Sequence, residues 1–311
     1  MSLSKNGARN DRTPEIRRLT VSFRSRMDRP LEADLDARLR AFLAEDVGSG
    51  DVTSLWTVPE SARAKGRLVA RSACVVSGLL VARRTFELLD SNLLWSGELA
   101  AGTAVSPGTI LARLSGGARA LMTAERVALN LLQRMSGIAT ATRRFADALE
   151  GTSCRVLDTR KTAPGLRVFD RMAVADGGGW NHRDGLWDMV LIKDNHRRLA
   201  GSVACAIAGI RREAPPGMKL EVEVEDEDDL RQALEAKVEM VLIDNQPPET
   251  FARWVAIARQ SAAPPFIEAS GNMTLERVRL YALAGADAVS VGSLTHSVTA
   301  ADIALDLEPD E

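Results

Sequence analysis

Six short runs of apolar and β-branched residues recur in the second half of the chain, and helix-like stretches separate them. The runs are 154–158, 188–193, 220–225, 238–244, 265–270 and 287–293. Amphipathic stretches such as 226–236 and 274–286 begin with acidic or Thr residues, as helices often do. Strands and helices that alternate at roughly 20- to 35-residue spacing predict parallel strands joined by crossover helices.

Polar residues follow each of the six runs. At least six such units favour a closed α/β barrel over an open doubly wound sheet, and in such barrels the site lies at the carboxyl ends of the strands. No G-x-G-x-x-G follows an early strand, which argues against a dinucleotide-binding fold. We therefore assign residues 139–296 to an α/β barrel.

The first half of the chain follows a different pattern. Residues 64–90 combine two strand-like runs with a helix, and residues 100–116 have Gly and Pro turns between short apolar runs, as hairpins do. A helical stretch at 119–149, interrupted near Gly137, connects the two halves. We predict a smaller α/β domain at 31–138 that includes this linking helix. The C-terminal segment, about 297–311, is a candidate to return to it.

Residues 1–30 are expected to be a flexible extension, with a targeting segment as the alternative.

Composition excludes several classes of function. The net charge of −2 and the pI of about 6.1 give no global electrostatic basis for binding nucleic acid or an anionic membrane surface. No apolar run approaches the length of a membrane helix, and we expect a cytoplasmic protein. The three cysteines are few, odd in number and far apart, so we expect free thiols.

Cations gather where the first two strands end. Arg160 and Lys161 follow the first run, and Lys193 ends the second. The segment between them holds Gly177 to Gly179, which we read as a flexible turn, and then His182 and Arg183 as further donors. Like charges repel one another, so convergent cations predict an anionic ligand and a loop that closes over it.

Acidic and Gly-rich strand ends complete the expected mouth. Glu223 and Asp244 end adjacent strands and are candidates to bind Mg²⁺ or ribose hydroxyls. Alternation places Glu221, Glu223 and Glu225 on one strand face, and helices around the sheet favour an inward carboxylate over a solvated edge. The turns at 270–272 and 292–293 predict a phosphate site. Because we find no Ser-His-Asp or Cys-His arrangement, the chemistry suggested is electrostatic positioning without a covalent nucleophile.

Several long motifs resemble the quinolinate phosphoribosyltransferase family, also called nicotinate-nucleotide pyrophosphorylase (carboxylating). The matching stretches are 44–54, 129–140, 157–167, 177–196, 221–225, 241–245, 268–278 and 290–297. The resemblance covers about residues 31–307. It implies an α/β fold with an N-terminal α/β sandwich-like domain and an irregular TIM-like α/β barrel, assembled as a homodimer or homohexamer with sites at subunit interfaces.

The resemblance also implies a reaction: quinolinate and phosphoribosyl pyrophosphate give nicotinate mononucleotide, pyrophosphate and CO₂, with Mg²⁺ as cofactor. The implied catalytic residues are Lys161, Glu223 and Asp244. The implied quinolinate ligands are Thr159, Arg160, Lys161, His182, Arg183 and, from a neighbouring subunit, Arg126. The implied ligands of phosphoribosyl pyrophosphate are Lys193, Glu223, Asp244, Ser270, Gly271, Asn272, Val291, Gly292, Ser293 and His296. Glu223 and Asp244 are the implied metal ligands, directly or through water.

Two alternative functions are also compatible with the fold expected from the sequence. A related barrel family associated with molybdenum transport shares the fold, but is expected to carry different residues at 181–196. A catalytically silent scaffold or phosphate-binding barrel is expected to lose some polar strand ends, whereas all of them are present here.

Overall fold

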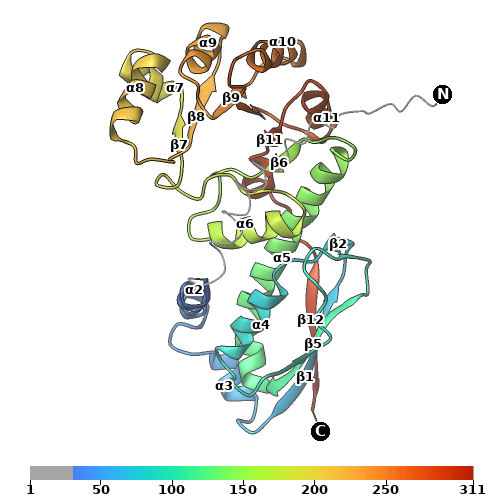
Figure 1. Cartoon of the computed structure of the whole chain (residues 1–311). Helices are drawn as coiled ribbons and strands as arrows, with labels where there is room; N and C mark the ends of the chain where they lie inside the picture. The colour runs from blue at the N-terminus through green and yellow to red at the C-terminus, as the bar shows by residue number, and fades with distance from the viewer. Residues whose placement is uncertain (1–30, 311) are drawn as a thin grey trace, which may run out of the picture.

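The structure, a computed structural model, describes residues 31–310, and the side chains from residue 34 onward. The extension expected at 1–30 lies outside the described residues. Two domains share one long helix, α5 (Ala118–Ala148), which runs from the N-terminal sheet to the parallel sheet (Figure 1). Within the described part, no helix is long and apolar enough to cross a membrane.

The N-terminal domain is built on a four-stranded antiparallel sheet of order β12-β1-β5-β3. Its strands are β1 (Arg63–Ala70), β5 (Ile110–Gly117), β3 (Leu94–Ser96) and β12 (Ile303–Pro309). A small pair, β2 (Cys74–Val75) and β4 (Ala104–Val105), lies beside it, with helices α2 (Leu31–Val47), α3 (Val52–Thr57) and α4 (Leu79–Glu87). Because β12 pairs with β1, the chain end returns to this domain.

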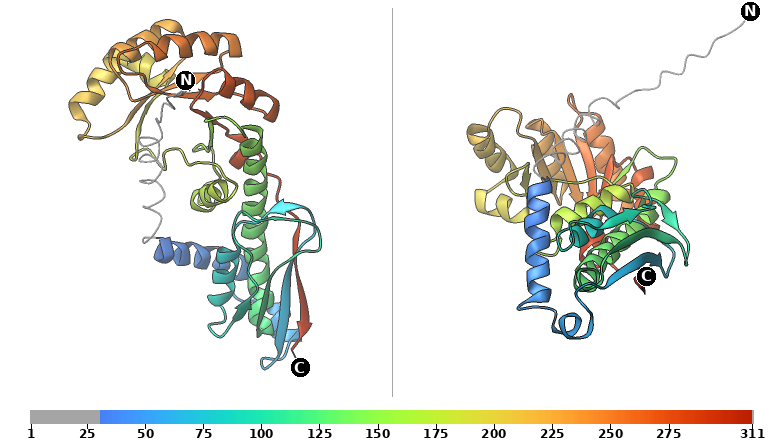
Figure 2. Two further views of the ribbon diagram at one scale, coloured as in Figure 1. Left: turned by 45° about the vertical axis from the view of Figure 1, so that its right-hand side comes forward. Right: turned by 90° about the horizontal axis from the view of Figure 1, so that it is seen from below.

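The second domain contains six parallel strands, one for each predicted run. Their order is β6 (Arg155–Leu157), β11 (Ala288–Ser290), β10 (Phe266–Ser270), β9 (Met240–Asp244), β8 (Leu220–Val224) and β7 (Val190–Ile192). The helices that connect or follow them are α6 (Arg167–Asp176), α7 (Asp194–Ala200), α8 (Val203–Glu213), α9 (Glu227–Glu235), α10 (Pro248–Arg259), α11 (Leu275–Leu283) and α12 (Ser293–His296). Helices α8 to α11 lie on the outside of the curved sheet (Figure 2).

The irregular α/β barrel that the resemblance implies is confirmed, but the closed ring that the number of strands favoured does not form among the described residues. Among residues 31–310 no ladder joins the edge strands β6 and β7. Trp180 instead forms a parallel bridge with Leu157: its N–H donates to Val156 O at 2.8 Å, and its carbonyl accepts from Asp158 N at 3.0 Å. The Arg155 guanidinium lies 3.3 Å from the centre of the Trp180 ring. The segment around Trp180 therefore occupies the edge where a closing strand would pair.

The glycines expected to interrupt or loosen the chain serve close packing instead. Helix α5 is continuous through Gly137, so the predicted interruption is wrong. A Cβ at Gly137 would lie 2.2 Å from Thr299 O, where the C-terminal segment crosses the helix. A Cβ at Gly177 would lie 2.5 Å from Ala139 O, and one at Gly179 would lie 2.7 Å from Thr142 Cγ2. The expected flexible turn at 177–179 is therefore packed tightly against α5.

Replacing Gly137 with Ala should destabilise the protein. The added methyl group meets backbone, which cannot move aside like a flexible side chain, so we expect a loss of about 1–3 kcal/mol in unfolding free energy. Urea denaturation followed by circular dichroism measures it. The matched control is Gly209→Ala in α8, where a Cβ meets nothing within 4 Å and helix propensity predicts a small gain. Equal effects of the two substitutions would contradict the packing role of Gly137.

Candidate active site

A cavity of about 770 Å³ opens at the carboxyl ends of the parallel strands. Each of the six strands contributes lining residues, either at its own end or from the turn that follows. Eleven predicted site residues line it: Thr159, Lys161, Lys193, Glu223, Asp244, Ser270, Gly271, Asn272, Gly292, Ser293 and His296. The carboxyl ends of the parallel strands between residues 154 and 296 thus meet at one concave surface, as the parallel topology requires.

Lys161 lies beside the last Gly-rich turn. Its backbone is fixed at both ends, because its N–H donates to Thr159 Oγ1 at 3.1 Å and its carbonyl accepts from Thr295 Oγ1 at 2.9 Å. A Cβ at Gly292 would lie 3.0 Å from Lys161 Cδ and 3.2 Å from the His296 ring. The missing side chain at Gly292 leaves room for the lysine, whose exposed ammonium group remains available to an anion.

The opposite side of the mouth is acidic. Lys193 Nζ donates to Glu223 Oε2 at 2.8 Å, and Glu223 is largely buried. Carboxylate oxygens of Glu223, Glu225 and Asp244 lie within 4.8 Å of one another. Hard oxygen donors of this kind suit Mg²⁺, so the residues present fit the expected metal. Sequence reasoning put Glu225 on the same face but did not select it as a ligand.

The turns after β9 and β10 have constrained backbones and pack against each other. Asn245 and Asn272 have φ values of 51° and 47°, and Gly271 has a φ of 98°. A Cβ at Gly271 would lie 2.2 Å from Asn245 Oδ1, and Asn245 N donates to Ser270 O at 3.0 Å. Left-handed non-Gly residues are uncommon and cluster at functional sites. Only glycine fits at position 271, which keeps the backbone of this turn open to the cavity.

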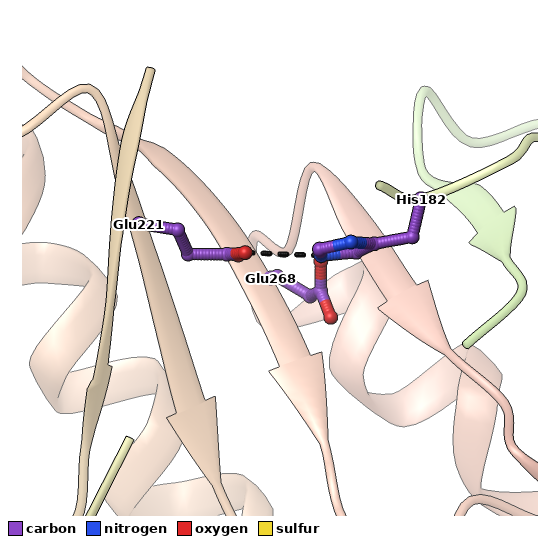
Figure 3. A group of neighbouring side chains, drawn as sticks. All are labelled: His182, Glu221 and Glu268. Atoms are coloured by element: carbon purple, nitrogen blue, oxygen red, sulfur yellow. Dashed lines mark hydrogen bonds and ion pairs between the residues drawn. The ribbon is translucent and has the colours of Figure 1, made fainter. Parts of the chain in front are cut away.

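A second layer of charge lies below the mouth. His182 Nε2 is 3.0 Å from Glu221 Oε2 and 3.3 Å from Glu268 Oε2, and the three side chains are 8%, 0% and 1% exposed (Figure 3). Burial and the nearby charge of Glu268 raise the pKa of Glu221. Neither acid was among the predicted site residues. The alternation in β8 favoured an inward acid without choosing Glu221, and the matching stretch 268–278 begins at Glu268 without assigning it a role.

The segment 180–183 is held in place beside β6 and does not line the cavity itself. His182 N donates to Asp158 Oδ1 at 2.6 Å, and Arg171 donates to the His182 carbonyl at 2.8 Å. Asp158 is fully buried, and burial raises its pKa to about 6 although Arg171 opposes the shift. The sequence did not indicate that Asp158 and Arg171 hold the backbone of His182, because these contacts join segments that are not adjacent in the chain.

Five predicted residues do not line the cavity. Arg183 is buried and donates to Met189 O at 3.0 Å, and burial together with nearby Arg160 lowers its pKa. Arg160 has a buried Nε with no hydrogen-bond partner in the described part. His182 lies in the deeper layer, and Val291 is a buried residue whose N–H donates to Leu157 O at 3.0 Å. Arg126 lies on the N-terminal half of α5, with its side chain 59% exposed.

These features define a class of protein: an α/β-barrel enzyme whose strand ends present cations, clustered carboxylates and Gly-rich turns to an anionic, phosphate-bearing substrate. Comparison with known proteins narrows the class. The family model described as "Quinolinate phosphoribosyl transferase, C-terminal domain" matches residues 138–306, and the one described as "Quinolinate phosphoribosyl transferase, N-terminal domain" matches residues 51–136. The chain belongs to the quinolinate phosphoribosyltransferase family.

Individual relatives agree with this membership. The chain is 40% identical over 269 residues to the "Probable nicotinate-nucleotide pyrophosphorylase [carboxylating]" of Bacillus subtilis, covering 86% of this chain and 92% of the relative. It is 38% identical over 291 residues to the chloroplastic nicotinate-nucleotide pyrophosphorylase of Arabidopsis thaliana, covering 88% and 83%. Among solved structures, NadC from Streptococcus pyogenes is similar, with a TM-score of 0.84, 37% identity and coverage of 89% and 97%.

Asp158 should make stability depend on pH. Its pKa rises from 3.8 to about 6 on folding, so the folded state binds this proton more tightly. The resulting stabilisation is complete below pH 3.8 and is lost as the pH rises through about 6. Asp158→Asn removes this titration and keeps an oxygen acceptor for His182 N. Relative to wild type, the variant should therefore gain up to about 3 kcal/mol of unfolding free energy between pH 4 and 7.

Urea denaturation of both proteins at several pH values measures this difference. The comparison at pH 4 is the internal control, since protonated Asp and Asn are alike in charge. A difference in unfolding free energy that stays constant from pH 4 to 7 would contradict the assignment.

Proposed function

We propose that this protein transfers the phosphoribosyl group of phosphoribosyl pyrophosphate to quinolinate, with release of pyrophosphate and CO₂, to give nicotinate mononucleotide for NAD biosynthesis. The observation that carries the proposal is the mouth cavity, which is lined by Lys161 and Lys193 together with Glu223 and Asp244. Family membership supports the same reaction, because the relatives carry the corresponding name.

The cations of the first two strand ends suit a pyridine dicarboxylate. In this proposal Arg160, Lys161 and Arg183 bind the two carboxylates of quinolinate, and Thr159 lines the same side. His182, implied by the resemblance as a further ligand, lies beneath them with both ring nitrogens already engaged by Arg183 N, Glu221 and Glu268. A charge-assisted hydrogen bond contributes about 1.5–3 kcal/mol, so losing the contacts to one carboxylate weakens binding by roughly one to two orders of magnitude. Nicotinate lacks the 2-carboxylate and should therefore bind more weakly than quinolinate by this factor, so that the site discriminates against it.

The remaining strand ends suit the phosphoribosyl donor. The turns at 270–272 and 291–293, with His296, are proposed to hold its 5′-phosphate, and Lys193 to hold its pyrophosphate. Glu223 and Asp244 would hold Mg²⁺, directly or through water, and Glu225 joins them in the same cluster of oxygen atoms. When bound, the ion offsets negative charge on the leaving pyrophosphate.

The side chains then act mainly by electrostatics. Positive charge develops on the ribose as its bond to pyrophosphate breaks, and the carboxylates of Glu223 and Asp244 stabilise that charge. Lys193 stabilises the departing pyrophosphate, and Lys161 holds the dicarboxylate in place while the pyridine nitrogen attacks the ribose. When the 2-carboxylate leaves as CO₂, the electron pair of the broken bond remains on ring carbon C2, where the adjacent positive nitrogen stabilises it, and a proton from solvent then bonds to C2.

Arg126 is proposed to act on the site of a second copy of this chain. It lies outside the cavity of its own subunit, one helical turn from the exposed Met122. The exposed side chains of Leu55 and Trp56 lie on α3, which contacts α5 at Ser54 and Met122. An apolar surface next to an unburied cation suits a homodimer or homohexamer in which this face meets the mouth of a neighbour.

The cytoplasmic location remains a prediction, because the Arabidopsis relative is described as chloroplastic.

Purified protein incubated with quinolinate, phosphoribosyl pyrophosphate and Mg²⁺ should form nicotinate mononucleotide. Chromatography measures this product, and trapping of CO₂ measures the decarboxylation. Lys161→Ala should lower turnover at least about 100-fold, because a charge close to the reacting atoms is lost. Its melting temperature should not change, since the side chain is exposed. The matched control is Arg212→Ala, an exposed cation on α8. Absence of product in wild type, or equal product from nicotinate, would overturn the proposed reaction.

Mixing two inactive variants tests the role of Arg126. Arg126→Ala and Lys161→Ala should each be inactive alone. After subunit exchange, about a quarter of wild-type activity should return, because half of random dimers are mixed and one site of each mixed dimer is intact. The same mixture held without exchange is the control. No recovery after confirmed exchange would show that Arg126 does not act in trans.

A further inference from the structure

Glu221 and Glu268 lie one layer below the mouth of the cavity. Glu221 precedes Glu223 by two residues on β8, and Glu268 precedes Ser270 by two residues on β10. Residues two apart on a strand point to the same side, so each acid lies beneath a residue that lines the cavity. Strands β8 and β10 flank β9, and the two carboxylates converge on the His182 ring (Figure 3).

The His182 ring has no freedom in this arrangement. Its Nδ1 accepts the backbone N–H of Arg183 at 2.7 Å, which places the ring hydrogen on Nε2, toward Glu221 and Glu268. The backbone N–H of His182 is held by Asp158. The two acids therefore fix the ring, and the ring fixes the backbone from which the Arg183 side chain extends.

A stable fold does not require two buried acids beside one histidine. Glu221 Oε1 and both oxygens of Glu268 are buried without a hydrogen-bond partner in the described part of the chain. Burying carboxylates beyond what their partners satisfy is unfavourable, and one imidazole N–H cannot satisfy two. The charge of Glu221 does have a counterpart, because Arg183 lies within electrostatic reach of Glu221 and also of Arg160. An arrangement that opposes stability and faces a binding site points to a role in that site.

We propose that Glu221 and Glu268 are positioning residues for recognition of the pyridine dicarboxylate. This inference rests on the function proposed above. Both acids orient His182 and through it the backbone of Arg183, and Glu221 offsets the repulsion between Arg183 and Arg160. The two arginines are therefore already in place when the dianion arrives. Preassembly lowers the ordering free energy of binding. Neither acid touches the substrate, and neither contacts the part of the mouth that receives the phosphoribosyl donor.

Glu221→Gln and Glu268→Gln test the proposal, because Gln keeps the shape and an oxygen acceptor but removes the charge. Each should raise the KM for quinolinate about tenfold, with the KM for phosphoribosyl pyrophosphate and kcat within about twofold of wild type. Melting temperatures should stay the same or rise, since buried charge is removed. Glu239→Gln is the matched control: Glu239 precedes β9 at the opposite end of the barrel, and its side chain accepts from Leu220 N.

Other outcomes overturn the proposal in distinguishable ways. Unchanged KM values for both substrates would remove the acids from recognition. Equal rises in both KM values with a lower melting temperature would show a structural role only. Because His182, Glu221 and Glu268 could also ligate a cation, metal content is measured by mass spectrometry. A stoichiometric metal in wild type that both variants lose would replace positioning with a metal site. Inactive wild type in the same assay would instead overturn the proposed function itself.

Discussion

Helix α5 is buried in two hydrophobic cores at once, and both domains depend on that packing. Leu132 belongs to the N-terminal core, and Met135, one turn later, belongs to the barrel core. From the same turn, Arg134 donates to Asp170 at 2.8 Å and to Thr295 O at 3.0 Å, and Thr295 in turn holds the Lys161 carbonyl. Because one rigid helix carries these contacts, the N-terminal sheet and the Lys161 turn are placed relative to each other without a hinge.

The parallel strands and their polar ends could be predicted from sequence because both are local signals. A buried parallel strand appears as a continuous apolar run, and the residues that follow it must lie at one edge of the sheet. Lys161, Lys193, Glu223 and Asp244 were identified in this way and do share one cavity. Family motifs then supplied roles that residue spacing alone could not assign.

The errors share a physical cause, which is contact between segments distant in sequence. Gly137 reads as a helix breaker until the backbone of Thr299 is seen to cross it, and Gly177 reads as flexible until Ala139 lies against it. The open ring of strands has the same kind of cause, because Trp180 pairs with Leu157 at the edge of β6. The role of Glu268 could not be read from residue spacing, because a single acid in a strand has no periodicity. Its importance depends on His182, which lies 86 residues earlier.

The division between Lys and Arg follows the two layers of the site. Only six of the 40 basic residues are Lys, yet Lys161 and Lys193 are the cations that line the mouth, and both are exposed. Arg183 lies deeper and is held by Met189 O. An ammonium group on a flexible stem can follow a polyanion as it leaves, whereas a fixed guanidinium fork matches the planar geometry of a carboxylate. Under the proposed function, Lys193 follows the departing pyrophosphate, whereas Arg183 binds the dicarboxylate beneath the mouth. In the same proposal the charge of Glu221 matters there, because Arg160 and Arg183 repel each other and a buried opposite charge offsets that repulsion.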